Sequence, residues 1–167
     1  MNTRPTSDRI RESIFNILSD LVRDAVVLDL FAGTGAMGIE ALSRGARYAV
    51  FIEQNRDALA TISQNIGKCS LENRSKIMRW DIVKNLNCLR NMQDPFTLVF
   101  MDPPYNQNMV EPALQNLIQS GSLAAGAVIA AEHTPEEMVQ AQGLEITDQR
   151  RYGKTTVSFL SYKRLAE

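Results

Sequence analysis

The chain has 167 residues, a length that suits one domain with a sizeable core. Apolar residues make up 44% and charged residues 22%, which is ordinary globular composition, and the net charge of -1 gives the whole chain no general affinity for polyanions. No apolar run approaches the roughly 20 residues of a membrane span, and the first ten residues lack the apolar stretch of a secretory signal. We therefore expect a cytoplasmic protein that does not enter a membrane.

Charge is distributed unevenly along the chain. Between Asn91 and Gln149 there is no Lys or Arg, so all 18 basic residues lie in the remaining segments. This pattern fits either a basic side beside an acidic mouth or a solvated surface of mixed charge. Cys69 and Cys88 have no C-x-x-C spacing and no nearby His, so we expect reduced thiols and no metal site.

The hydrophobic pattern predicts strands that alternate with helices. In chain order we expect a helix over 6–21, a strand over 25–31, a helix over 36–43, a strand over 48–53, a helix over 56–69, a strand over 75–81, a helix over 82–92, a strand over 96–102, a helix over 109–119 and a strand over 126–133. Residues 144–164 predict two strands that meet around 152–154.

Such alternation predicts an α/β fold with a mostly parallel sheet, helices on both faces and one antiparallel strand near the end of the chain. Ligands in these sheets bind at the carboxyl ends of the strands, near the point where strand order reverses. Four acids fall at or near predicted strand ends: Asp29, Glu53, Asp81 and Asp102. We expect them to mark the functional site. His133 also ends a strand, where a structural hydrogen bond is the expected role.

A glycine-rich loop follows the first strand. Gly33, Gly35 and Gly38 form G-x-G-x-x-G, and the first two allow a sharp turn and close approach to a ligand. Glu53 lies twenty residues after Gly33 and could accept both hydroxyls of a ribose. The loop and this acid fit NAD and S-adenosylmethionine equally well.

Asp29 favours the second ligand. A carboxylate just before the loop would repel a pyrophosphate, whereas it suits a sulfonium and an ammonium group; its alternative role is to cap loop amides. Asp81 either accepts a hydrogen bond from an adenine amino group or caps a helix that begins at Ile82. Both roles of Asp81 stay open.

The segment Asp102, Pro103, Pro104, Tyr105 follows the fourth strand and predicts a stiff turn. The lone pair of an exocyclic amine on a nucleobase is delocalised into the ring, which makes the nitrogen a poor nucleophile. Acceptors on its two N–H bonds, from Asp102 and the Pro103 carbonyl, would free that lone pair, while Tyr105 could stack on the base. The turn therefore predicts chemistry on an amino group.

Together the glycine loop and "DPPY" resemble the class I S-adenosylmethionine-dependent methyltransferases that act on amino groups. More narrowly, residues 4–18, 29–46 and 99–105 are similar to the bacterial 16S rRNA guanine-N2 methyltransferase family. The resemblance implies one Rossmann-like domain over 1–167 with about seven strands, and methyl transfer to a guanine N2 in 16S rRNA with S-adenosylhomocysteine as product. The implied partner is 16S rRNA or an assembly intermediate of the small ribosomal subunit, and we expect a monomer.

The resemblance also implies roles for individual residues. Asp102 to Tyr105 would hold the target amine, with Arg4 to Thr6 near the cofactor or RNA, and the cofactor would be held by Asp29, Phe31, Ala32, Gly33, Thr34, Gly35, Glu53, Gln54, Asp81 and Ile82. Family members usually begin with a short basic β-hairpin, which we expect this chain to lack. The remaining candidates for RNA contacts are Arg9, Arg11, Arg74, Lys76, Arg79, Arg150, Arg151 and Lys154.

Three alternatives remain open at this level. Adenine-N6 methylation of DNA or RNA needs the same chemistry, and only the resemblance separates it from guanine-N2 methylation. A nicotinamide-dependent oxidoreductase is disfavoured by Asp29 and by the "DPPY" turn. An RNA-binding module that no longer catalyses is disfavoured by the intact motif.

Overall fold

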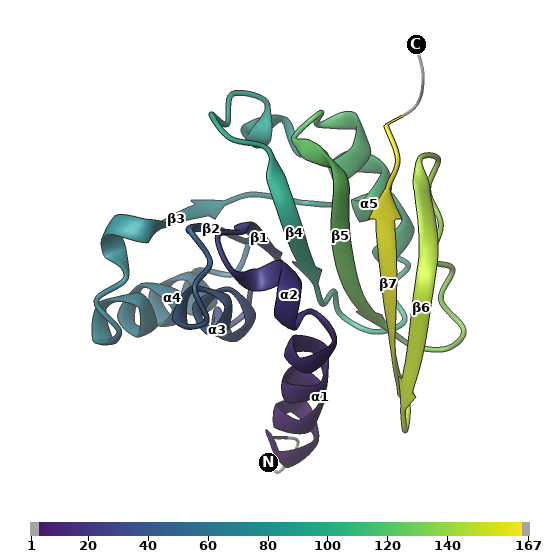
Figure 1. The fold of residues 1–167 in the computed structure, drawn as a ribbon, viewed down its shortest axis with the longest axis horizontal. Coiled ribbons are helices and arrows are strands. Elements are labelled where there is room, and N and C mark those ends of the chain that lie inside the picture. Colours follow the sequence, from purple (N-terminus) through teal and green to yellow (C-terminus); the bar gives the residue numbers. More distant parts are fainter. Residues whose placement is uncertain (1–3, 165–167) are drawn as a thin grey trace.

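One seven-stranded sheet forms the centre of the molecule (Figure 1), with the strand order β3-β2-β1-β4-β5-β7-β6. This computed structural model describes residues 4–164, and describes side chains from residue 7 onward. The strands are β1 (Val26–Leu30), β2 (Tyr48–Glu53), β3 (Ser75–Arg79), β4 (Phe96–Met101), β5 (Leu123–His133), β6 (Leu144–Tyr152) and β7 (Thr155–Tyr162). The helices are α1 (Arg4–Ile17), α2 (Ser19–Val22), α3 (Ala36–Ser43), α4 (Arg56–Lys68) and α5 (Val110–Gln119), with single 3-10 turns η1 (Glu72–Arg74) and η2 (Asn87–Leu89).

The predicted fold class is confirmed. Strands β3, β2, β1, β4 and β5 pair in parallel, whereas β7 is antiparallel to both β5 and β6. β7 lies between β5 and β6, and a two-residue connection, Gly153 and Lys154, joins β6 to β7. The chain leaves β1 toward β2 on one side and returns to β4 on the other, so strand order reverses between β1 and β4. The crevice at this reversal is where α/β sheets bind ligands.

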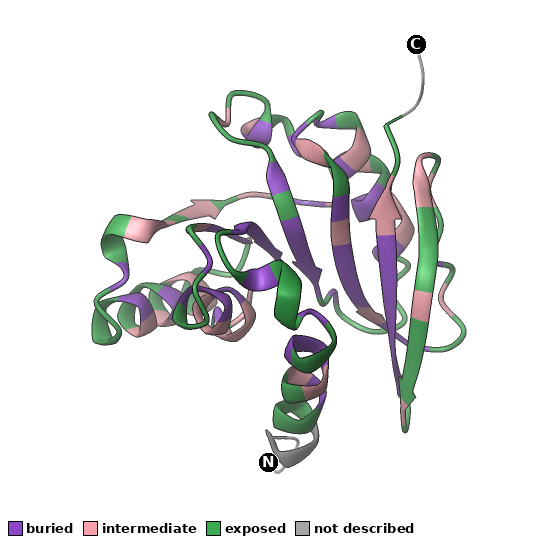
Figure 2. Cartoon of the chain, viewed as in Figure 1, coloured by how far each residue is buried: buried purple, intermediate pink, exposed green. Residues whose placement is uncertain are grey.

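Both faces of the sheet are covered. Successive residues of a strand point to opposite faces, and in the central strands both sets are buried. All five residues of β1 are buried, as Figure 2 shows for the centre of the sheet. Val27 packs with residues of α1, α3 and α4, whereas Leu28 packs with residues of α5 and the 82–89 segment. This two-sided burial explains why the central strands are nearly continuous apolar runs.

Most predicted boundaries hold to within a few residues, but the helix expected over 82–92 is wrong. The segment forms turns, with only η2 in helical conformation. The indole N–H of Trp80 donates to the backbone carbonyl of Asn85 at 3.0 Å, and the Asn85 side chain accepts from the backbone N–H of Asn87 at 3.0 Å. Such local bonds compete with the regular pattern of a helix.

A second interaction comes from α5. The amide nitrogen of Asn116 donates to the carbonyl oxygens of Ile82 at 2.9 Å and of Val83 at 2.8 Å. These carbonyls would otherwise accept the first bonds of the expected helix. Ile82, Leu86 and Leu89 of the segment are nevertheless buried, so the periodicity indicated these core positions correctly and the backbone conformation wrongly. The helix expected over 6–21 is also divided, since α1 ends at Ile17 and α2 begins at Ser19.

Within residues 4–164, no helix combines the length and the apolar character needed to cross a membrane.

Candidate active site

A cleft of about 730 Å³ lies at the carboxyl edge of the sheet and joins segments that are far apart in the sequence. We call it the central cleft; it is lined by Ser7, Ile10, Phe31, Gly33, Glu53, Asp102, Pro103, Pro104, Tyr105, Glu132 and Thr155. The glycine loop and the 102–105 turn, which the sequence predicted separately, therefore form walls of one cavity.

The loop after β1 adopts an unusual backbone conformation. Phe31, Gly33 and Gly35 have φ angles of 56°, 59° and 80°, in the left-handed region that favours glycine. At Gly33 a Cβ would meet no atom within 4 Å, which leaves open space at this wall. Backbone strain at the non-glycine Phe31 is typical of a residue held in place for function.

Asp29 is 3% exposed and acts on the loop from inside the protein. Its Oδ2 accepts a hydrogen bond from the backbone N–H of Gly38 at 2.9 Å. Helix α3 starts after Gly35, which offers no capping side chain, so Asp29 serves as a cap from another element. Burial raises the pKa of Asp29 to about 8, the Gly38 bond opposes this shift, and the charges of Asp102 and Glu53 add to it.

Glu53, at the end of β2, holds three backbone amides. Its Oε1 accepts from the N–H of Gly33 at 2.9 Å, and its Oε2 accepts from Gln54 at 2.8 Å and Asn55 at 2.9 Å. These bonds connect the carboxyl ends of β1 and β2 and leave the carboxylate at the wall of the central cleft. The geometry fits a carboxylate whose remaining lone pairs face a ligand.

The other predicted cofactor residues divide between the loop and a neighbouring hollow. The backbone N–H of Ala32 donates to the carbonyl of Ile52 at 3.1 Å, and the carbonyl of Thr34 accepts from the Asn65 side chain at 3.0 Å. A second hollow of about 510 Å³ is lined by Gln54, Arg79, Trp80, Asp81, Lys84, Asn85 and Asn87. Consecutive residues line the two cavities, Glu53 the central cleft and Gln54 this hollow.

Asp81 is exposed in that hollow, and its expected role as a helix cap is wrong because no helix begins there. Its backbone carbonyl accepts from the N–H of Lys84 at 3.2 Å, which closes a turn. Ile82 is 3% exposed and packs in the core below the sheet edge. The exposed carboxylate of Asp81 keeps the adenine role open, whereas Ile82 contributes mainly to packing.

The 102–105 turn places an acid and an aromatic ring at the cleft. Asp102 follows β4 directly, Pro103 is buried and Pro104 is exposed. Tyr105 is 46% exposed, and its hydroxyl forms a 2.8 Å hydrogen bond with Thr155 Oγ1 on β7. This bond fixes the ring at one end while leaving part of its surface open to a planar ligand.

A brace holds the segment that follows this turn. Glu137 accepts from the backbone N–H of Asn106 at 2.7 Å and from that of Thr134 at 3.0 Å. The Thr134 hydroxyl donates to the Asn106 side chain at 3.1 Å. The loops after β4 and β5 are therefore joined beside the cleft, and Asn106 holds a left-handed φ of 57° there.

Sequence reasoning missed Glu132, which lies at the carboxyl end of β5. In the register of the parallel pair, Met101 is opposite Ala131, so Asp102 and Glu132 leave neighbouring strands at the same level. Burial raises the pKa of Glu132 to about 8, with further increases from the charge and hydrogen bond of Asp102 and from Asp29. An acid near the end of an apolar parallel strand was the available signal, the same one that drew attention to Asp29 and Asp102.

Asp102 is exposed at the cleft, so contact with water limits how far the surrounding protein can shift its pKa. Its pKa is still raised, because neighbouring protein atoms desolvate it, and the hydrogen bond with Glu132 opposes that shift. Glu132 thus carries the proton of the pair more readily, and Asp102 is the group that faces the cleft as a carboxylate.

The expected structural role of His133 is confirmed. His133 is 2% exposed, with Nδ1 at 2.7 Å from the Thr134 carbonyl and Nε2 at 2.7 Å from Ser158 Oγ. A carbonyl only accepts, so Nδ1 carries the proton and the Ser158 hydroxyl donates to Nε2. His133 holds the end of β5 against β7 and does not take part in the central cleft.

Comparison with known proteins places these features in one family. The family model described as "Conserved hypothetical protein 95" matches residues 1–161. "Putative rRNA methyltransferase YlbH" of Bacillus subtilis is 34% identical over 98% of this chain and 89% of its own length. "Ribosomal RNA small subunit methyltransferase D" of Escherichia coli is 32% identical over 98% of this chain and 81% of its own length.

A solved structure supports the same relationship. "Putative methyltransferase yhhF" from Escherichia coli superposes with a TM-score of 0.82 and 30% sequence identity, over 96% of this chain and 88% of that one. The resemblance carried by residues 4–18, 29–46 and 99–105 is therefore confirmed. The chain belongs to the "Conserved hypothetical protein 95" family, together with relatives named as methyltransferases of small-subunit ribosomal RNA.

Proposed function

We propose that this protein transfers a methyl group from S-adenosylmethionine to the exocyclic N2 amine of a guanine in 16S rRNA. The observation that supports this most directly is the union of the glycine loop, Glu53 and the 102–105 turn in the central cleft. One wall suits an adenosine-containing cofactor and the facing wall suits an amine on a planar base. The names of the relatives support methyl transfer to an rRNA substrate.

The residues of the central cleft fit the cofactor. Open space at Gly33 lets backbone approach a ligand, the Glu53 carboxylate lies where a ribose would present its hydroxyls, and the adjoining hollow with Asp81 can receive an adenine. The acids around the cleft attract a cationic ligand. S-adenosylmethionine, when bound, supplies an electrophilic methyl group on a sulfonium.

The chain's own residues prepare the amine. Asp102 and the carbonyl of Pro103 each accept one N–H of the amine, which draws its lone pair out of conjugation with the base. Tyr105 stacks on the base and, held by Thr155, sets its distance from the cofactor wall. When nitrogen forms its bond to the methyl carbon, the bond from that carbon to sulfur breaks. The surplus proton of the amine passes to the Asp102 carboxylate.

A base in a helix cannot reach this cleft, so the target guanine must be unpaired or flipped out. The partner is thus 16S rRNA or an assembly intermediate of the small subunit that exposes the base, and the site of action is the cytoplasm. All residues of the central cleft come from one chain, which is sufficient for a monomer to act. Adenine-N6 methylation remains the competing reaction, because Asp102 and Pro103 would serve that amine equally.

The first test is calorimetric titration of the purified chain with S-adenosylhomocysteine and, separately, with NAD. We expect micromolar binding of the first and none of the second; the reverse result would make the glycine loop a dinucleotide site and overturn the proposal.

The second test incubates the protein with 16S rRNA and S-adenosylmethionine and locates the methyl group by mass spectrometry of nucleosides. N2-methylguanosine is the expected product, whereas N6-methyladenosine would select the competing reaction. Asp102→Ala should abolish product while leaving S-adenosylhomocysteine affinity within about twofold. Asp20→Asn removes an exposed acid in α2, which precedes β1, and should turn over normally; retained turnover in Asp102→Ala would exclude the assigned role.

A further inference from the structure

A groove runs from the central cleft between α1 and the turn of the β6–β7 hairpin. It consists of two adjoining hollows of about 360 and 510 Å³, which share Arg9 and Ser13. We call it the α1 groove; it is lined by Arg9, Ile10, Glu12, Ser13, Asn16, Ile17, Arg150, Arg151, Tyr152 and Gly153. Ile10 lines both this groove and the central cleft, so the two are continuous. In Figure 1, α1 and the hairpin turn lie at the edge where β4 and β5 end.

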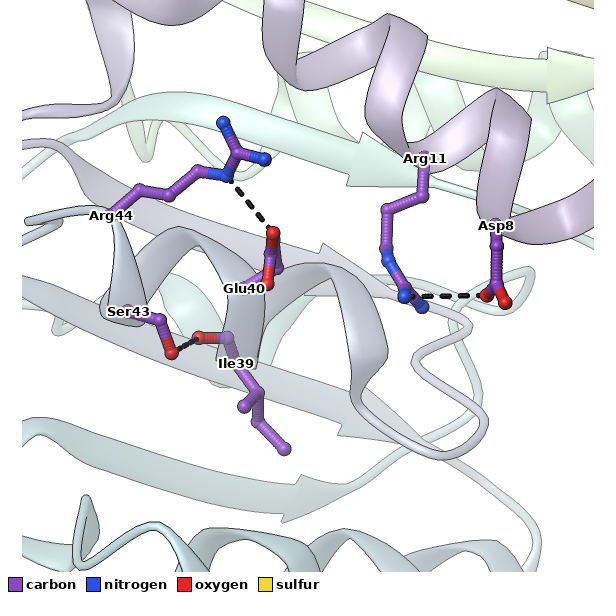
Figure 3. A network of polar contacts seen from close by, with 6 residues as sticks. All are labelled: Asp8, Arg11, Ile39, Glu40, Ser43 and Arg44. Carbon is purple, nitrogen blue, oxygen red and sulfur yellow. Dashed lines mark hydrogen bonds and ion pairs between the residues drawn. The ribbon is translucent and has the colours of Figure 1, made fainter.

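The groove is positively charged. Arg9, Arg150 and Arg151 line it against a single acid, Glu12. Arg150 is paired with Asp148 at 3.1 Å, whereas Arg9 and Arg151 form no ion pair within the described part of the chain. Other arginines are paired: Arg11 with Asp8 at 3.3 Å and Arg44 with Glu40 at 3.0 Å (Figure 3).

The groove is also a fixed surface. The hydroxyls of Ser13 on α1 and Tyr152 on β6 are hydrogen-bonded to each other, which ties the helix to the hairpin. Nε of Arg151 donates to the Gly153 carbonyl at 3.1 Å, so the guanidinium is anchored through Nε and its two terminal amino groups are not used in this bond. An arginine pre-oriented in this way suits a phosphate, which accepts two parallel N–H bonds.

The surface next to the 102–105 turn has the opposite charge. A hollow of about 500 Å³ there is lined by Glu111, Glu136 and Glu137 and carries no basic side chain. An anionic polymer that enters the central cleft is repelled on this side and attracted along the α1 groove. Positive and negative charge thus lie on different sides of the cleft, although the net charge of the whole chain is only -1.

We propose that the α1 groove binds the phosphate backbone of the RNA strand next to the target base, with Arg9 and Arg151 as the principal phosphate contacts. The strand enters the central cleft over α1 and the β6–β7 turn and avoids the side of Glu111, Glu136 and Glu137. This inference rests on the proposed function for the identity of the polymer. The groove contacts phosphate and not base edges, so it supplies affinity and orientation without sequence preference.

The test measures binding of a fluorescein-labelled RNA hairpin with a guanine in its loop, by anisotropy over a series of salt concentrations. The Arg9→Ala/Arg151→Ala double variant should bind at least tenfold more weakly at low salt. The magnitude of the slope of log K against log salt should fall by about 1.4 to 1.8, since each of the two phosphate contacts contributes roughly 0.7 to 0.9. Calorimetry with S-adenosylhomocysteine checks that this variant remains folded and binds cofactor normally.

The matched control is Lys68→Ala/Arg90→Ala. It removes two exposed cations that precede strands β3 and β4 and therefore lie at the opposite edge of the sheet. An equal loss of affinity in both double variants would show that overall charge governs binding and would overturn the α1 groove, as would the absence of RNA binding by the unmodified chain.

Methylation of the same hairpin separates this inference from the proposed function. Groove-dependent binding without any methyl transfer would support the α1 groove and contradict the proposed function. Methyl transfer by the Arg9→Ala/Arg151→Ala variant at the rate of the unmodified chain would support the proposed function and contradict the α1 groove.

Discussion

The carboxyl groups of Asp102 and Glu132 are hydrogen-bonded neighbours at the ends of two adjacent parallel strands. Two ionised carboxylates repel each other and neither can donate, so the bond requires one of them to carry a proton. Glu132 is the less exposed of the two, and the charges of Asp102 and Asp29 add to the effect of burial on its pKa, which makes it the proton carrier. Its O–H then orients Asp102 as the acceptor that faces the cleft.

This relationship predicts a pH-dependent stability. Burial raises the pKa of Glu132 from 4.5 to about 8, so between these values the folded protein keeps a proton that the unfolded chain releases. The free energy of unfolding must therefore fall as pH rises from about 4.5 to 8 and level off above that. Glu132→Gln has no proton to lose and should be more stable than the unmodified chain at pH 8, on the order of 1 kcal/mol.

Denaturant unfolding at pH 5.5 and at pH 8 measures this difference. Glu136→Gln is the control, because its exposed carboxyl should leave the pH dependence unchanged. A Glu132→Gln variant with the same slope against pH as the unmodified chain would show that Glu132 does not hold the proton.

Asp29 gives a second prediction, on cofactor binding. Burial raises the pKa of Asp29 to about 8, and a nearby cation favours the ionised form. Binding of S-adenosylmethionine at pH 7 should therefore release protons, seen as a binding enthalpy that changes between phosphate and Tris buffers. Asp29→Asn should reduce this buffer dependence while its amide oxygen still accepts the Gly38 bond. A buffer-independent enthalpy for the unmodified chain would contradict the effect.

Glu53 gives a third prediction, because it serves both the loop and the expected ribose. Glu53→Ala leaves the N–H groups of Gly33, Gln54 and Asn55 without their acceptor, and it removes the ligand for the hydroxyls. We expect S-adenosylhomocysteine affinity to fall by at least tenfold, corresponding to about 1.5–3 kcal/mol for lost hydrogen bonds to a charged group. Glu53→Gln keeps one acceptor oxygen, so its affinity should fall between those of the unmodified chain and Glu53→Ala. Unchanged affinity of Glu53→Ala in calorimetry would remove Glu53 from the cofactor site.

Gly38 gives a fourth prediction, concerning the packing of α3 on the sheet. A Cβ at Gly38 would lie 2.4 Å from Cε1 of Phe51, a buried ring, so Gly38→Ala should destabilise the protein by roughly 1–3 kcal/mol. Gly67→Ala is the matched comparison, since its Cβ would meet only Glu72 Oε1 at 3.7 Å in α4. It should be neutral or stabilising by about 0.5–1 kcal/mol. Equal midpoints for both variants in thermal unfolding would contradict the packing argument.

Several features follow from local sequence because their causes are local. Buried strands such as β1 and β2 are apolar runs between turn residues, and their bounds agree with prediction to within a residue. The glycine loop needs residues that tolerate left-handed φ, and the 102–105 turn needs two prolines, so both are visible in a few adjacent letters. Asp29, Glu53 and Asp102 could be selected because parallel strands end at one edge.

What the tertiary structure decided depends on partners that are distant in sequence. The segment 82–92 has a helical pattern, but Asn116 and Trp80 take its backbone carbonyls. The sequence placed Glu132 near the end of an apolar strand, but only strand pairing set it beside Asp102. Arg9 and Arg151 are more than a hundred residues apart, and only the packing of α1 against the hairpin turn makes them one groove. Local spacing determines elements and motifs, whereas pairing and packing determine which charges meet and which of them keep their protons.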